Sequence, residues 1–167
     1  MTCLFTPIDE PTLKQIAAYW SGLRDGCALP SRQQIDPTGI PAAGRPHLFL
    51  VDFSDEEPDM VFRLGGPVFE RQMGTCLKGK SLRDLPISAC DPSFLAEYRD
   101  VRRYRAPSYV IDRFADPEWT HVSVKRILLP LSTDGTVVDG ALGAAIFFRS
   151  EACPNRSFLF RLQTPGA

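Results

Sequence analysis

Histidine and paired cysteines, which build most metal sites and disulfide frameworks, are scarce in this sequence. Its 167 residues include two histidines, His47 and His121, and neither has a partner at metal-ligand spacing. The five cysteines are odd in number, widely spaced and without a Cys-x-x-Cys pair. We therefore expect no metal site and no disulfides, and interpret the cysteines as small buried apolar groups in a reducing compartment.

The sequence also has no excess of one charge and no long hydrophobic run. Its 19 lysines and arginines stand against 20 aspartates and glutamates, so no overall field attracts nucleic acid or an anionic membrane. The first residues do not form a secretory signal, and no stretch approaches the roughly 20 apolar residues of a bilayer span. These absences predict a cytoplasmic protein with no nucleic acid and no membrane among its partners.

Signature motifs of several enzyme classes are missing as well. The sequence contains no G-x-S-x-G nucleophile elbow, no phosphate-binding Walker loop and no G-x-G-x-x-G dinucleotide fingerprint. His121 is a candidate base, with Asp116 or Glu118 as its orienting partner, but a histidine at the start of a strand more often has a structural role. We predict no catalytic residues.

Hydrophobic spacing and turn residues predict a mixed set of helices and strands. The predicted elements are, in chain order, a helix over 11–24, an ordered connector over 29–46, strands over 47–53 and 60–65, short helical turns over 67–85, a helix over 92–104, and strands over 108–114, 121–129 and 137–148. Asp134-Gly135 is a strong hairpin signal between the last two strands. Pro130 argues against a continuous strand ladder, whereas Gly140 and Gly143 indicate a bulge or a close backbone approach.

Two strands, a helical stretch and a three-strand meander describe an α+β fold. We expect an antiparallel five-stranded sheet with helices on one face and an extra N-terminal helix. The length fits one domain over residues 1–167. Its expected parts are an N-terminal helix (1–28), a connector (29–46), a core (47–149) and a tail (150–167) with an apolar patch at 158–160.

Several short motifs, in their order along the chain, resemble those of the PAS domain. They are Trp20, Leu29-Pro-Ser-Arg32, Ile35-Asp-Pro37, Phe62-Arg-Leu-Gly65, Gly74-x-x-Leu77-x-Gly79-x-Ser81-Leu82, and Leu128-Leu-Pro-Leu131 with Ser132, Asp134, Gly135, Val138 and Asp139. More narrowly, the chain resembles short single-domain PAS-like proteins of alphaproteobacteria over most of its length. It departs from them at Arg63-Leu-Gly-Gly-Pro67, where Arg-Leu-x-Gly-Thr is expected, which leaves the start of the central helices open.

The resemblance implies a sheet in the order 2-1-5-4-3 and a ligand pocket between the sheet and its helices. It also implies dimerisation or signalling through the N-terminal helix and the sheet surface. PAS pockets sometimes carry flavin or haem. Cys90 stands where a photoactive flavin site has its cysteine, but the asparagine, arginine and glutamine of that motif are missing, and the long helix offers no histidine to a haem. We therefore expect no cofactor and interpret Cys90 as a packing residue.

Five residues of the strands and the long helix are candidates for ligand contacts in that pocket, because an apolar wall with a few polar groups orients a ligand. They are Arg63, Tyr98, Tyr104, Tyr109 and Phe147. The alternative for Tyr98 and Phe147 is that they fill the core.

Two groups of charged residues allow either a structural or a binding role. Arg32 and Asp36 either lock the connector to the domain or bind an anionic ligand group. Four arginines crowd the end of the long helix, where cations oppose the negative pole of the helix; a phosphate or nucleic-acid site is the alternative, disfavoured by the interleaved Glu97 and Asp100. These arginines are Arg99, Arg102, Arg103 and Arg105.

Together these features favour a stand-alone sensory and regulatory domain that binds a small organic ligand, a signalling partner such as a sensor kinase, or both. We expect a homodimer through the N-terminal helix, because an amphipathic helix outside the core needs something to cover its apolar stripe. The stripe consists of Leu13, Ile16, Ala17, Trp20 and Leu23. The alternative is a small-molecule-binding or enzymatic α+β domain with a similar sheet, a larger cavity and no signalling role.

Overall fold

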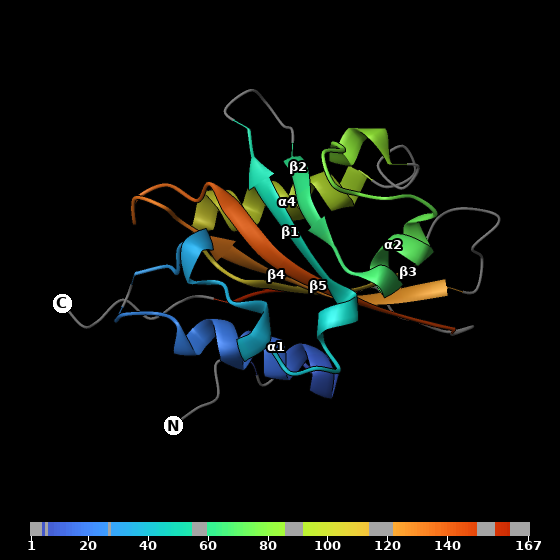
Figure 1. Ribbon diagram of the computed structural model, residues 1–167, viewed down its shortest axis with the longest axis horizontal. Coiled ribbons are helices and arrows are strands. Elements are labelled where there is room, and N and C mark those ends of the chain that lie inside the picture. The colour runs from blue at the N-terminus through green and yellow to red at the C-terminus, as the bar shows by residue number, and fades with distance from the viewer. Residues whose placement is uncertain are drawn as a thin grey trace.

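The computed structural model describes residues 5, 7–26, 28–54, 60–85, 92–113, 122–149 and 156–160. Its helices and strands are α1 (Pro11–Gly22), β1 (Leu48–Phe53), β2 (Met60–Gly65), α2 (Pro67–Met73), α4 (Pro92–Tyr104), β3 (Ser108–Arg113), β4 (Val122–Leu131), β5 (Gly140–Arg149) and β6 (Arg156–Leu159) (Figure 1). Among these residues, no helix is both long enough and apolar enough to cross a membrane.

The strands form one antiparallel sheet in the order β2-β1-β5-β4-β3-β6. The first five strands confirm the predicted order 2-1-5-4-3, and β6, which comes from the tail, pairs with β3 as a sixth strand. β4 and β5 pair along their whole length, from Val122 opposite Arg149 to Leu131 opposite Gly140. The loop between them contains Gly135 with φ of 78°, a left-handed conformation that glycine adopts without strain.

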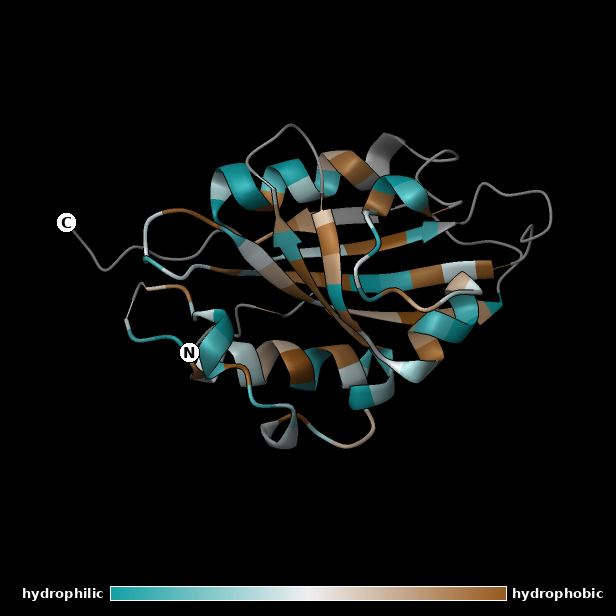
Figure 2. Ribbon diagram, turned by 45° about the horizontal axis from the view of Figure 1, so that its top comes forward, coloured by the Kyte–Doolittle hydropathy of each residue, from teal (hydrophilic) through white to brown (hydrophobic). Residues whose placement is uncertain are grey.

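Helices cover both faces of the sheet, so the described residues form three layers (Figures 1 and 2). α1 and the connector lie on one side, which we call the α1 face, and α2 and α4 lie on the other, the α4 face. Alternation along β4 serves both layers, because successive side chains of a strand point to opposite sides. Val124 and Leu128 pack on the α4 face, whereas Ile127 and Leu129 pack on the α1 face.

The apolar stripe of α1 is buried within the chain itself. Leu13, Ile16, Ala17 and Trp20 are each 0% exposed and pack in the cluster on the α1 face. The indole Nε1 of Trp20 donates a hydrogen bond of 3.0 Å to the carbonyl oxygen of Pro130. The sheet of the same chain therefore covers the stripe, and the physical reason for expecting a dimer through this helix was wrong.

The expectation that Pro130 interrupts the ladder was also wrong. β4 continues through Pro130, which lies opposite Ala141 of β5, to Leu131. The N–H and C=O groups of one strand residue point to the same side, and the Pro130 carbonyl points to Trp20, away from β5. The missing N–H therefore costs β5 no hydrogen bond, and β3, on the other side, ends its pairing at Leu128.

Two glycines of β5 face close neighbours on β1, and at Gly140 this is the close backbone approach that was one of the two expectations. A Cβ atom at Gly140 would lie 2.7 Å from the carbonyl oxygen of Val51. At Gly143 it would lie 2.1 Å from the ring of Phe49, closer than any real contact. Both positions therefore exclude a side chain unless β1 shifts.

The departure from the family at Pro67 coincides with the start of α2. Pro67 occupies the first turn of this helix, and Gly74 ends it with φ of 69°. A proline is tolerated there because the first N–H groups of a helix have no partner within the helix. The proline at this position is thus compatible with the start of α2.

Candidate functional site

Two of the five predicted ligand-contact residues lie on the α4 face. Tyr98 of α4 is 2% exposed, and Phe147 of β5 is partly buried against the same apolar cluster. The ring centroid of Tyr98 lies 6.3 Å from that of Phe53, and the ring centroid of Phe147 lies 6.0 Å from that of Phe69. Both residues thus belong to the layer in which the PAS resemblance implies a ligand pocket.

The other three residues lie elsewhere. Tyr109 of β3 is buried on the α1 face, where its hydroxyl donates to Oδ1 of Asp9 at 2.5 Å. Tyr104 is 55% exposed at the end of α4, and Arg63 is exposed on β2. Burial and the bond to Asp9 raise the pKa of Tyr109 above its usual range. The structure therefore does not bring the five residues together, because they occupy different sides of the sheet and its surface.

A buried ionic group, which no sequence pattern singled out, lies in the same layer as Tyr98. The side chains of Glu97 of α4 and Arg126 of β4 are 5% and 2% exposed. Arg126 donates from Nε and Nη2 to Oε2 of Glu97 at 2.8 and 2.5 Å, and the hydroxyl of Ser108 in β3 donates to Oε1 at 2.5 Å. This group joins α4 to two strands of the sheet.

The electrostatics of this group keep its guanidinium charged. Burial by itself lowers the pKa of Arg126, but the Glu97 carboxylate outweighs that effect and raises it. Burial also raises the pKa of Tyr98 above its usual range, so its phenol stays protonated. Alternation along β4 could have revealed Arg126, because it stands between Val124 and Leu128, both of which face α4.

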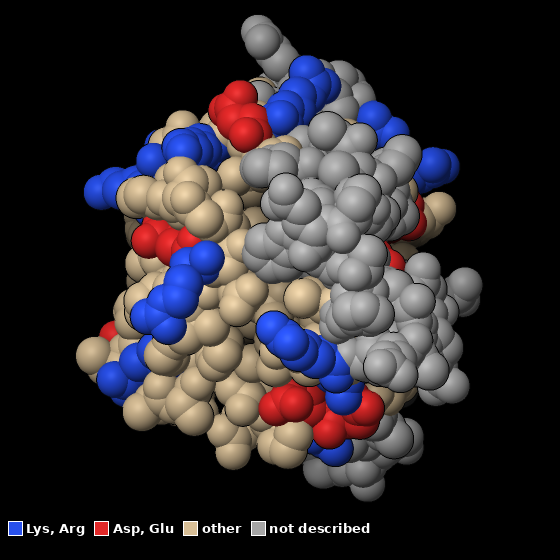
Figure 3. Space-filling model, turned by 90° about the vertical axis from the view of Figure 1, so that its right-hand side faces the viewer, with Lys and Arg blue, Asp and Glu red and all other residues tan. Residues whose placement is uncertain are grey.

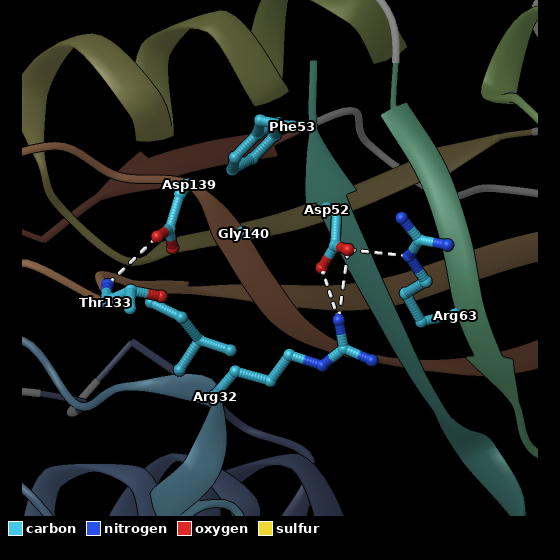
Figure 4. Close-up of a pocket in the computed structure, with 8 residues that line it drawn as sticks. Arg32, Asp52, Phe53, Arg63, Thr133, Asp139 and Gly140 are labelled. Carbon is cyan, nitrogen blue, oxygen red and sulfur yellow. Dashed lines mark hydrogen bonds and ion pairs between the residues drawn. The ribbon is translucent and has the colours of Figure 1, made fainter. Parts of the chain in front are cut away.

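A second charged group forms a pocket on the α1 face (Figure 4). The pocket has a volume of about 320 Å³ and is lined by Arg32, Asp52, Phe53, Arg63, Leu131, Thr133, Asp139 and Gly140. Nη1 of Arg32 lies 3.0 Å from both carboxylate oxygens of Asp52, and Nε of Arg63 lies 2.6 Å from Oδ2 of Asp52. Arg32 thus ties the connector to β1, whereas Asp36 accepts hydrogen bonds from Thr38 within the connector.

The arginines at the end of α4 include two that anchor neighbouring loops. Arg102 donates to the carbonyl oxygen of Ser54, and Arg105 to that of Gly135, each at 2.8 Å. Acidic and basic side chains are interspersed on the side shown in Figure 3, which lies away from the C-terminal end of α4. These contacts support the structural interpretation of the cluster.

No three acidic, histidine or cysteine side chains gather to hold a metal ion in the part of the chain that the structure describes. Cys90, His121 and the proposed partners of His121, Asp116 and Glu118, lie outside that part. The interpretation of these residues as structural stays a prediction.

Comparison with known proteins identifies the family. The chain is similar to a LOV protein of Rhodobacter sphaeroides, with 19% identity, a TM-score of 0.46, and coverage of 81% of this chain and 67% of that chain. It is also similar to an RNA-binding light-oxygen-voltage receptor, with 17% identity, a TM-score of 0.47, and coverage of 70% of this chain and 35% of that chain. No curated protein matches the chain. A family model of the PAS domain matches residues 8–146, so the protein belongs to the PAS domain family, whose members are typically sensory and ligand-binding.

Proposed function

We propose that the protein is a sensory domain that binds a small organic ligand between α4 and the sheet. The observation that supports this proposal is the buried pair of Glu97 and Arg126, which lies beside the apolar cluster between α4 and the sheet. Taking two charges out of water costs several kcal/mol for each ion, and a well-packed apolar pair is often at least as stable. A polar anchor among apolar walls is, by contrast, what orients a small ligand.

In this proposal Arg126 and Glu97 offer the ligand charged hydrogen-bonding groups, and Tyr98 and Phe147 offer apolar walls. A ligand acceptor that takes a hydrogen bond from Arg126 competes with the Glu97 carboxylate for the same donors. Because Glu97 belongs to α4 and Arg126 to β4, this competition changes how firmly the helix is held on the sheet. Ligand binding is thereby linked to the position of a surface helix.

The proposal includes a protein partner, such as a sensor kinase or another signalling protein, and a cytoplasmic location. A homodimer through the N-terminal helix would have to use the outer side of α1, since its apolar stripe is buried. Lys14, Gln15 and Ala18 are exposed on that side. Sedimentation or light scattering of a Gln15→Glu, Ala18→Glu variant tests this contact: a dimer in the wild type that becomes a monomer supports it, and a monomeric wild type contradicts it.

Native mass spectrometry beside denaturing mass spectrometry tests the ligand directly. We expect the freshly purified protein, or protein incubated with a small-molecule extract of cells, to carry a mass that denaturation releases. The double variant Glu97→Leu, Arg126→Met should fold and lose that mass. Arg99→Met, an exposed arginine of the same helix, is the matched control and should keep it.

Two results would contradict the proposed function. One is a wild-type protein with no releasable mass both as purified and after incubation with the extract. The other is a releasable mass that the double variant retains in full, which would assign Glu97 and Arg126 a purely structural role.

A further inference from the structure

We propose that the pocket on the α1 face is a second ligand site, which takes a small zwitterion of the α-amino acid class. The pocket contains neither Glu97 nor Arg126 and lies on the other side of the sheet from them. It is built from segments far apart in the sequence: the connector, the end of β1, the middle of β2, and the loop between β4 and β5 with the two strand ends that flank it.

One side of the pocket carries an excess of positive charge. The guanidinium groups of Arg32 and Arg63 both bond to the single carboxylate of Asp52. Nε and Nη2 of Arg32 and both Nη atoms of Arg63 have no hydrogen-bond partner among the residues that the structure describes. A guanidinium has more N–H donors than one carboxylate uses, so each arginine can hold a ligand carboxylate and keep Asp52.

The opposite side of the pocket carries a negative charge. Figure 4 places Asp139 across Gly140 from Asp52, with its carboxylate turned toward Thr133. Oδ2 of Asp139 accepts a hydrogen bond of 3.0 Å from the backbone N–H of Thr133. Oδ1 of Asp139 has no partner within the described ranges. A ligand ammonium can donate to this oxygen without breaking the bond to Thr133.

These two sides together favour a ligand with both charges. A simple anion at the arginines would also face two carboxylates, and a simple cation at Asp139 would also face two guanidinium groups. A zwitterion satisfies both sides and adds no net charge. Phe53 and Leu131 line the remaining wall and leave an apolar surface for a side chain. The volume of about 320 Å³ lies at the lower end of small-molecule sites, roughly 300–1,000 Å³, which fits an amino acid.

The test is binding of each standard L-amino acid to the full chain, measured by thermal denaturation and then by titration calorimetry. We expect at least one amino acid to bind at millimolar concentration or below. Its N-acetyl derivative and its amide, which each lack one charge, should bind at least about tenfold more weakly, because each loses a charge-assisted hydrogen bond. Arg63→Gln and Asp139→Asn should weaken binding by a similar factor. Arg71→Gln and Asp25→Asn, which change exposed residues outside the pocket, should leave it unchanged.

Three results would overturn the proposal: no amino acid binds, the N-acetyl or amide form binds as well as the free amino acid, or both pocket variants bind as the wild type does. Since Asp139 also holds the loop at Thr133, amide chemical shifts of the wild type give a second readout, with changes expected at Thr133 and Gly140. Changes only at residues of the α4 face would also overturn it. The double variant Glu97→Leu, Arg126→Met should keep amino acid binding, so failure of the proposed function is distinguishable from failure at this site.

Discussion

Replacement of Arg126 by methionine is the sharpest test of the buried ionic group. The side chain of Arg126 is 2% exposed and that of its partner Glu97 is 5% exposed. Among the described residues, Arg126 supplies two hydrogen bonds to the Glu97 carboxylate, and Ser108 supplies a third. The variant therefore leaves this carboxylate buried, with the neutral Ser108 hydroxyl as its donor within that part of the chain.

The expected loss of unfolding free energy is about 3–5 kcal/mol, the cost of breaking a buried pair by removal of one partner. Glu97→Leu removes the main carboxylate partner of the Arg126 guanidinium, and we expect a loss of unfolding free energy at the lower end of the same range, because the buried Asp112 also acts on that guanidinium. The double variant removes both charges, so we expect it to lie within about 1 kcal/mol of the wild type or above it. The two single losses are then far from additive, as expected of residues in direct contact.

Urea unfolding at neutral pH, followed by far-ultraviolet circular dichroism, measures these differences. With a slope of about 2 kcal/mol/M, each single variant should lower the midpoint by about 1.5–2.5 M. The reasoning would be refuted if each single variant lowered the free energy of unfolding by less than about 1 kcal/mol, or if the double variant lowered it by the sum of the two single losses. The double variant keeps the test usable if a single variant proves too unstable to purify.

Three further changes probe the packing of the two faces. Trp20→Phe removes the donor of the hydrogen bond to the Pro130 carbonyl, and we expect the free energy of unfolding, measured with urea, to fall by about 1–3 kcal/mol. An unchanged urea midpoint would contradict this and would show that water replaces the indole as donor. Gly143→Ala forces a methyl group against the ring of Phe49, so the melting temperature should fall by an amount equivalent to at least about 1–3 kcal/mol. Above pH 10.0, the ordinary tyrosine pKa, the unfolded chain releases phenol protons that the folded chain retains at Tyr109, so stability falls as pH rises. Tyr109→Phe should make the free energy of unfolding fall less steeply between pH 10 and 12. An equally steep fall in the variant would contradict the raised pKa of Tyr109.

Elements with strong local signals could be predicted closely. The helix predicted over 92–104 is α4 with the same bounds, because a proline at the first helical position marks its start. The strand over 60–65 is likewise β2, and the order of the first five strands followed from the resemblance to the PAS domain. The close approach at Gly140 could be predicted because a glycine inside a strand often marks a place where another backbone comes near. At Gly143 the neighbour is instead the ring of Phe49.

Contacts between distant segments could not be predicted in the same way. Whether Pro130 breaks a ladder depends on which side of β4 has a partner, and this is decided by where β3 ends and where Trp20 lies. Glu97 looked like one acidic residue among the arginines of a solvated helix, and Arg126 lies 29 residues further along the chain. Of the predicted ligand contacts, Tyr98 and Phe147 share a face; both lie in elements that were predicted as a helix and a strand, although β5 begins at Gly140, three residues later than expected.

The sequence by itself determined the periodic elements, the apolar stripe of α1 and the family, since periodicity and short motifs depend on neighbours along the chain. Only the tertiary structure decided what covers that stripe and which charged groups meet. Among 19 basic and 20 acidic residues, each cation has many candidate partners. Strand register and the path of the connector select Asp52 for Arg32 and Arg63, and Glu97 for Arg126. These pairings depend on the packing of the whole chain, which lowers the free energy of all segments together. Local alternation can place Arg126 on the α4 face, but it does not name the partner of that side chain.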